Sequence, residues 1–231
     1  LVMKKNYWLV LFVSCLIAEL LLTYTGNEIL RYITKPLLMP FLCAYYLAAV
    51  RSTAGFNRSI IAALFFSWLG DILLMFDSGS SLFFILGLSS FLIAHIFYIF
   101  FFHAVRIAEA IKPKGFLLIP VVVYYAVLIS ILSPGLGDMK LPVRVYGVVI
   151  CFMLMLALHM FFIKNKKAGL LMAFGAFLFV ISDSILAINK FYASFSQAGV
   201  LVMLTYGIAQ LLITEGAIKY NSGIAKTGNP S

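Results

Sequence analysis

Two aspartates inside long apolar runs are the residues of this sequence best suited to chemistry. Asp71 is the only charged residue between positions 60 and 76, and Asp183 is the only one between positions 169 and 188. A carboxylate near the centre of a bilayer is unfavourable by about 2.5 to 3.5 kcal/mol, which makes each a candidate functional residue. A carboxyl can donate a proton and a carboxylate can stabilise a positive charge, so the pair predicts acid–base catalysis. The alternative for either residue alone is a hydrogen bond between helices that fixes packing.

Two further charged residues accompany the aspartates. Glu19 interrupts the apolar run at 7–24, and Lys35 directly precedes Pro36 at the start of the next run. When a lysine lies beside two buried carboxyl groups, the carboxyl pair can hold one proton at neutral pH, because the like charges raise one pKa and the cation lowers the other. We therefore expect Glu19 and Lys35 to support the aspartates or to bind substrate.

Four polar residues in later runs are candidates for the same site. His95 and Tyr98 are three residues apart, and Tyr206 and Gln210 are four apart, so each pair shares one face of a helix. We expect Tyr206 and Gln210 to line a cavity. For His95, packing and participation in the site are equally compatible with the sequence.

No metal or other cofactor is expected. His103 and His159 lie near predicted helix ends, far in depth from His95, whereas zinc ligands must converge within about 2 to 2.2 Å of one ion. The three cysteines lie in apolar runs without Cys-x-x-Cys spacing, which favours buried thiols.

The composition requires lipid as the solvent for these residues. Of 231 residues, 64% are hydrophobic and 11% are charged, and the mean hydropathy is +1.08. Soluble domains have about 45 to 50% apolar and about 25% charged residues. The net charge of +9 comes from basic residues that are dispersed between the apolar runs. We interpret these residues as signals for membrane topology and expect no nucleic-acid partner.

The apolar runs predict an all-α polytopic membrane protein. Each run is long enough to cross a hydrocarbon core of about 30 Å, and the whole chain, 1–231, is expected to form one integral membrane domain. The first run resembles a secretory signal, but it contains Glu19 and lacks a small-x-small cleavage site, so we interpret it as a membrane helix. The expected helices are near 7–24, 33–50, 60–76, 82–104, 116–133, 143–163, 169–188 and 194–214.

The basic residues predict that both termini are cytoplasmic. In this orientation only five of the 17 basic residues face outward, namely Arg31, Lys35, Lys140, Arg144 and Lys190. In a bacterium, the membrane would be the cytoplasmic one. The third and seventh helices then run in the same direction. At about 1.5 Å per residue, Asp71 and Asp183 lie within roughly 5 Å of the same depth, in the outer half of the membrane.

Four short segments resemble the YhhN-like lysoplasmalogenase family. They are Lys-Pro-Leu at 35–37, Phe-Ser-Trp-Leu-Gly-Asp-Ile-Leu-Leu-Met at 66–75, Gly-Leu-Ser-Ser-Phe-Leu-Ile-Ala-His-Ile-Phe-Tyr at 87–98 and Phe-Val-Ile-Ser-Asp-Ser-Ile-Leu-Ala at 179–187. Tyr206 and Gln210 fit the last segment of that family. The resemblance implies an eight-helix hydrolase with intramembrane aspartates at Asp71 and Asp183. It implies cleavage of the vinyl ether bond of lysoplasmenyl-ethanolamine or lysoplasmenyl-choline, which releases a fatty aldehyde and a glycerophospho-ethanolamine or -choline.

The implied reaction suits two carboxyl groups. A vinyl ether hydrolyses by slow protonation of its β-carbon, and water then attacks the resulting oxocarbenium ion. One protonated carboxyl can donate that proton while a carboxylate stabilises the cation and activates water. No nucleophilic serine is needed, and the sequence contains no Gly-x-Ser-x-Gly motif. A related lysolipid is the alternative substrate.

Two other functions are compatible with the sequence. In a transporter or channel, Glu19, Asp71, His95 and Asp183 would form a proton or cation path. The small size and the lack of helices broken by Gly or Pro at matching positions of the two halves speak against it. A non-catalytic lipid-binding protein would bind lysolipid without forming product.

Overall fold

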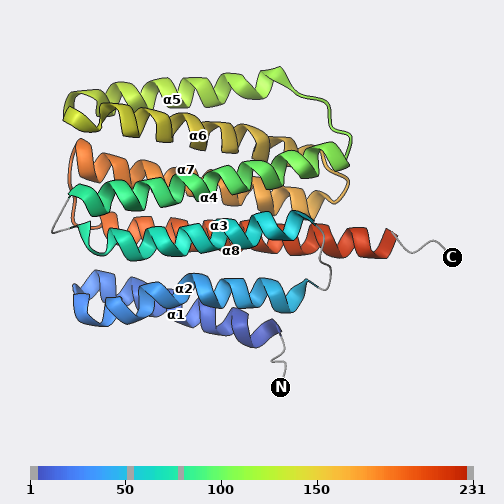
Figure 1. Cartoon of the computed structure of the whole chain (residues 1–231), viewed down its shortest axis with the longest axis horizontal. Coiled ribbons are helices and arrows are strands. Elements are labelled where there is room, and N and C mark those ends of the chain that lie inside the picture. The colour runs from blue at the N-terminus through green and yellow to red at the C-terminus, as the bar shows by residue number, and fades with distance from the viewer. Residues whose placement is uncertain (1–4, 51–54, 78–80, 228–231) are drawn as a thin grey trace.

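The computed structural model describes residues 5–50, 55–77 and 81–227. Within these ranges the chain forms eight long α-helices and no strand, which confirms the expected all-α class (Figure 1). The long helices are α1 (Lys5–Thr25), α2 (Glu28–Ala49), α3 (Gly55–Leu74), α4 (Ser81–Ala108), α5 (Leu118–Leu132), α6 (Lys140–Leu158), α7 (Lys166–Phe191) and α8 (Ala198–Thr227). Short 3-10 helices in the connections are η2 (Gly115–Leu117), η3 (Ser133–Gly135), η4 (Gly137–Met139) and η5 (His159–Phe162).

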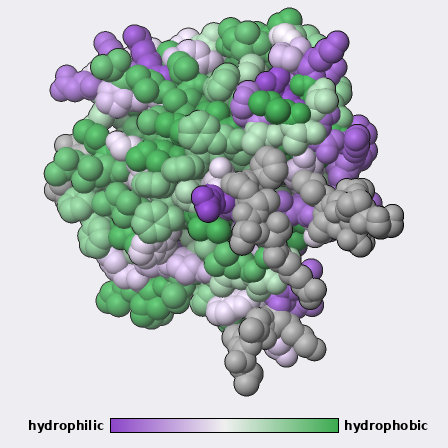
Figure 2. All heavy atoms as spheres, turned by 45° about the vertical axis from the view of Figure 1, so that its right-hand side comes forward, coloured by the Kyte–Doolittle hydropathy of each residue, from purple (hydrophilic) through white to green (hydrophobic). Residues whose placement is uncertain are grey.

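The exterior of the bundle is suited to lipid. Seven of the described helices are long and apolar enough to cross a membrane. The remaining long helix, α2, has 22 residues but carries Glu28, Arg31 and Lys35 in its first turns. Large apolar side chains are exposed on most helices, and Figure 2 shows a mainly hydrophobic face with hydrophilic residues gathered mostly toward its top and right. In water such a surface would drive association, whereas lipid solvates it. The protein is therefore an integral membrane protein.

The last helix extends well past its predicted end. The apolar run predicts an end near residue 214, but α8 continues to Thr227. Its polar extension is stabilised by partners from other helices: the Asn221 amide donates to Asn57 Oδ1 over 3.0 Å and to the Tyr46 hydroxyl over 3.3 Å. A prediction from hydropathy places the end of a helix where polar residues begin. It therefore misses a polar extension that is stabilised by hydrogen bonds to other helices.

Most helices that follow one another in the chain pack as antiparallel neighbours. The closest pairs are α1 with α2, α3 with α4, and α7 with α8, while α4 also packs on α6 and α8 contacts α1 and α2. In Figure 1, α5 lies at one edge of the bundle and α1 and α2 lie at the other. At Gly175 of α7, an added Cβ would lie 2.8 Å from Ile213 N and 2.9 Å from Ala209 O of α8. Glycine therefore permits this close backbone approach, as small residues commonly do between membrane helices.

Two prolines within α2 leave a backbone carbonyl free to accept a hydrogen bond from α3. Pro40 has no N–H, so the carbonyl of Pro36 lacks its usual intrahelical donor. The indole Nε1–H of Trp68 donates to that carbonyl over 2.9 Å. This bond joins the turn that carries Lys35 to the turn before Asp71, and so it sets how these two charged residues approach each other.

Candidate active site

Asp71 and Asp183 line one cavity near the end of the bundle where α1 turns into α2 and α7 approaches α8. The cavity has a volume of about 180 Å³ and is formed by side chains from α2, α3, α4, α7 and α8. Its polar lining includes Arg31, Lys35 and Tyr206. Three carboxyl groups, those of Asp71, Asp77 and Asp183, thus border one space together with a phenol and two cations.

Asp71 is buried and has one hydrogen-bond donor among its described neighbours. The hydroxyl of Tyr206 in α8 donates to its Oδ2 over 2.7 Å. Its neighbour Gly70 lets α3 approach α4, because an added Cβ would lie 2.6 Å from the ring of Phe91. The ring of Phe91 in turn packs edge-on against Tyr206. Packing and hydrogen bonding therefore hold the Asp71 carboxyl in one orientation.

Asp183 has a corresponding partner from a different helix. The hydroxyl of Tyr146 in α6 donates to its Oδ2 over 2.5 Å. His95 Nε2 lies 3.6 Å from the same oxygen, which is too long for a hydrogen bond. The fully buried His95 ring instead makes edge contacts with Tyr146 and Phe179. His95 thus packs beside Asp183 without hydrogen bonding to it.

A second, apolar cavity meets the first at Asp183. It has a volume of about 40 Å³, and Asp183 and Tyr146 line it together with apolar side chains from α3, α4, α6 and α7. Asp183 borders both cavities, whereas Asp71 borders only the polar one. The site therefore has a polar side and an apolar side, with one carboxyl at their junction.

Tyr98 and Gln210 are not part of the lining of either cavity. The Tyr98 hydroxyl donates to Gln210 Oε1, and Gln210 Nε2 donates to Ser67 Oγ over 2.9 Å. All three residues are buried. The prediction that Gln210 faces the cavity with Tyr206 is not met, because its amide is engaged by α3 and α4.

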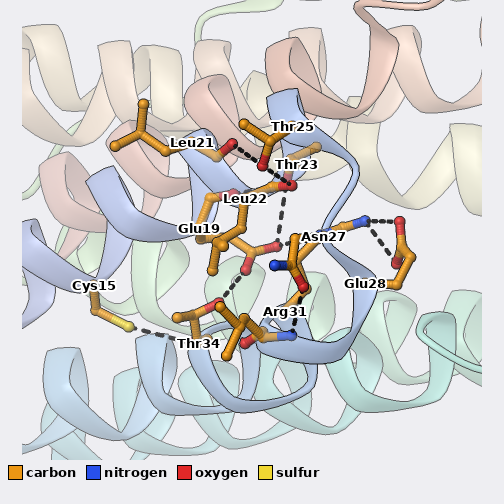
Figure 3. Close-up of polar contacts among 11 residues, drawn as sticks. Cys15, Glu19, Leu21, Leu22, Thr23, Thr25, Asn27, Glu28, Arg31 and Thr34 are labelled. Carbon is orange, nitrogen blue, oxygen red and sulfur yellow. Dashed lines mark hydrogen bonds and ion pairs between the residues drawn. The ribbon is translucent and has the colours of Figure 1, made fainter.

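Glu19 does not line either cavity. It is fully buried in α1. Its Oε1 accepts from Arg31 Nε over 3.1 Å and its Oε2 accepts from Thr34 Oγ1 over 2.5 Å (Figure 3). Glu19 is therefore connected to the polar cavity only through Arg31, which does line it.

The sequence interpretation did not single out Tyr146 or Arg31 as site residues. A signal for Arg31 was present, since Arg31 and Lys35 are four residues apart and share one face of α2. The signal for Tyr146 was weaker. It is a tyrosine in an apolar run, and a buried tyrosine hydroxyl usually needs a hydrogen-bond partner. In the part of the chain that the structure describes, no group of three or more His, Cys, Asp or Glu residues could hold a metal ion.

The chain is similar to several known proteins over most of its length. The chain is 32% identical to human lysoplasmalogenase TMEM86B over 193 residues, which cover 82% of this chain and 76% of the human protein. It is 31% identical to human lysoplasmalogenase TMEM86A over 187 residues, or 78% of this chain and 72% of that protein. It is 30% identical to a lysoplasmalogenase of Mycobacterium bovis over 196 residues, or 83% and 72% of the two chains. No solved structure matches the chain significantly.

The family assignment rests on most of the chain. The model of the YhhN family matches residues 30–217, a span that includes Lys35 and both aspartates and excludes Glu19. The resemblance predicted from the four short segments is thereby confirmed. The chain belongs to the YhhN family.

Proposed function

We propose that this protein is a lysoplasmalogenase, a membrane hydrolase that cleaves the vinyl ether bond of a lysophospholipid. The observation that carries the proposal is that Asp71 and Asp183 line one cavity. It is supported by the names of the related proteins, which are lysoplasmalogenases from human and bacterial sources. These names favour the hydrolase over a transporter that uses the same carboxyl groups.

The chemistry assigns different tasks to the two carboxyl groups. A protonated carboxyl transfers its proton to the β-carbon of the vinyl ether, and the π electrons form the new C–H bond. The α-carbon becomes an oxocarbenium ion, which a nearby carboxylate stabilises while it removes a proton from the attacking water. The hemiacetal then collapses to the aldehyde and the glycerol hydroxyl. No covalent enzyme intermediate is required.

The two cavities suggest which aspartate is the acid. The first carbons of the alkenyl chain belong in the small apolar cavity, and the glycerol with its headgroup belongs in the polar one. The β-carbon lies on the chain side of the ether oxygen, and only Asp183 borders the apolar cavity. Asp183 is therefore the proton donor to carbon, and Asp71 stabilises the cation and activates water from the polar side.

The neighbouring residues orient these groups. Tyr146 and Tyr206 each donate to one carboxyl oxygen, which leaves the other oxygen of each aspartate for the reaction. Lys35 lines the polar cavity and binds the phosphate of the substrate. The bias of basic residues supports a site in the outer half of the membrane, and in a bacterium this would be the cytoplasmic membrane.

The test is an assay for aldehyde. Purified protein in detergent or nanodiscs is incubated with lysoplasmenyl-ethanolamine, and the released aldehyde is quantified. A parallel incubation with the saturated 1-O-alkyl analogue is the control. The vinyl ether is expected to be cleaved and the saturated ether is expected to remain intact, because only the double bond accepts a proton at carbon. No aldehyde from either lysoplasmenyl-ethanolamine or lysoplasmenyl-choline would refute the proposal.

A further inference from the structure

A wider cavity adjoins the polar cavity at the start of α2. Its volume is about 410 Å³, and it shares Arg31, Lys35 and Asp77 with the lining of the polar cavity. Glu28 and Tyr32 of α2 complete its polar side. A polar headgroup attached to a lipid that is bound at the aspartates would extend into this space.

Lys35 is a buried cation without a bonded partner in the described ranges. The residue is only 9% exposed, and no described residue makes a hydrogen bond or an ion pair with its amine. The Asp71 carboxyl of the same cavity interacts with this charge through space but makes no bond to the amine, and a buried cation is unfavourable unless hydrogen bonds satisfy its donors. Because Lys35 lines both cavities, an anionic group placed there would compensate its charge.

Arg31 lies one turn before Lys35 and is held in place by two glutamates. Its Nε donates to Glu19 Oε1 over 3.1 Å, and its Nη1 donates to the two oxygens of Glu28 over 2.8 and 3.0 Å (Figure 3). Nη2 has no partner among the described residues. A guanidinium fixed in this way offers a preorganised donor for phosphate.

Asp77 provides the opposite charge at the same opening. Its Oδ2 accepts from Lys190 Nζ over 2.6 Å. Its Oδ1 is buried and has no hydrogen-bond partner in the described part of the chain. A buried carboxylate oxygen normally has a donor, and a ligand N–H placed in the cavity would supply one.

We propose that Arg31, Lys35 and Asp77 form a subsite for a phosphoethanolamine headgroup. The phosphodiester is bound by the two cations, and the primary ammonium donates to Asp77 Oδ1. A trimethylammonium group has no N–H, so the subsite selects ethanolamine over choline lipids. This inference rests on the proposed function, which supplies the lysophospholipid as the ligand.

The test measures binding without turnover. Saturated 1-O-alkyl-glycerophosphoethanolamine and the matching phosphocholine lipid are titrated against the full chain. The wild type is expected to bind the ethanolamine lipid roughly tenfold more tightly, which corresponds to a hydrogen bond to a charged group. Equal affinity for the two lipids would overturn the proposal.

Variants of Asp77 test the ammonium contact. Asp77→Ala is expected to abolish the preference while it retains affinity for the phosphocholine lipid, which also reports that the protein is folded. The control is Lys190→Gln, which removes the ion pair of Asp77 but leaves its carboxylate, so the preference should remain. A preference that survives in Asp77→Ala would exclude this role for Asp77.

Variants of Lys35 test the phosphate contact. Lys35→Gln is expected to weaken binding of both phospholipids roughly 10- to 100-fold, with unchanged affinity for 1-O-alkylglycerol, which lacks phosphate. Lys140→Gln changes an exposed lysine outside both cavities and should have no effect. Inorganic phosphate and phosphoethanolamine without a chain should compete only weakly. Competition as strong as that of the lipid would mean that the site serves a soluble phosphate and would overturn the proposal.

The two proposals fail in different ways. Selective binding of the saturated lipid without aldehyde release from the vinyl ether would refute the hydrolase and leave the subsite intact. Aldehyde release at equal efficiency from ethanolamine and choline substrates, with equal binding of the two saturated lipids, would refute only the subsite.

Discussion

The hydroxyl of Tyr146 donates a hydrogen bond to Asp183 Oδ2 over 2.5 Å, and this contact joins α6 to α7 at the junction of the polar and apolar cavities. It leaves Oδ1 of Asp183 as the oxygen that can reach a bound substrate. The ring of Tyr146 also lies edge-on to His95, so one residue both contacts the carboxyl and lines the apolar cavity.

Removing the Tyr146 hydroxyl should slow the reaction. Tyr146→Phe keeps the ring contacts but frees the Asp183 carboxyl to rotate, so we expect kcat to fall roughly 10- to 100-fold with little change in KM. Steady-state kinetics with lysoplasmenyl-ethanolamine measure both constants. The matched control is Tyr125→Phe, whose hydroxyl contacts the Arg144 carbonyl and does not line either cavity. Equal kinetics of the two variants would contradict an orienting role.

Replacing either aspartate by asparagine should abolish turnover in a folded protein. Asparagine keeps the volume and can accept the tyrosine hydrogen bond, but it cannot donate a carboxylic proton or stabilise the oxocarbenium charge. Asp71→Asn and Asp183→Asn are each expected to lose at least about 100-fold in kcat. Asp138→Asn, in an exposed connection, serves as the control. Wild-type turnover by Asp183→Asn would rule out the mechanism.

Protonation at carbon leaves an isotopic mark. In D₂O, the wild type should show a normal solvent deuterium isotope effect, and the aldehyde should carry deuterium at the carbon next to the carbonyl. Mass spectrometry of the trapped aldehyde measures the label. An unlabelled product that is stable to exchange would show that the bond is cleaved by another route.

Glu19 and Glu28 both contact Arg31, but they should differ in effect. Glu19→Gln removes a fully buried partner and is expected to raise KM roughly tenfold by loosening Arg31, with kcat nearly unchanged. The Glu28 side chain is 68% exposed, and exposed ion pairs contribute little, so Glu28→Gln should behave like the wild type. Kinetics of the two variants, measured side by side, make the comparison. A larger rise in KM from Glu28→Gln than from Glu19→Gln would mean that Glu28, and not Glu19, holds Arg31 in place.

The bond from Trp68 to the Pro36 carbonyl should stabilise the fold. Trp68→Phe leaves that carbonyl without its donor, and we expect the free energy of unfolding to fall by about 1 kcal/mol. Trp8→Phe is the control, because no described hydrogen bond involves its indole. Unfolding in a mixed-detergent titration measures both variants. Equal stability would mean that another group satisfies the carbonyl.

The sequence alone determines the membrane class, the number of long helices and the unusual placement of the aspartates. These follow from properties that act along one helix: the length of each apolar run, the insertion penalty of a carboxylate, and the rise per residue that sets depth. The shared cavity of Asp71 and Asp183 is in keeping with their matched depth. The i to i+4 spacing of Arg31 and Lys35 likewise places both on one side of α2 without reference to another helix.

Only the tertiary structure decides which side chains from different helices meet. Tyr206 reaches Asp71, Tyr146 reaches Asp183, and Gln210 turns toward Ser67. The helices are apolar on nearly all sides, so no hydrophobic stripe reveals which face turns inward. Rotation and pairing are set instead by close contacts such as that of Gly175 with α8 and by hydrogen bonds between helices. Those contacts depend on residues far apart in the chain, so spacing within one helix does not predict them.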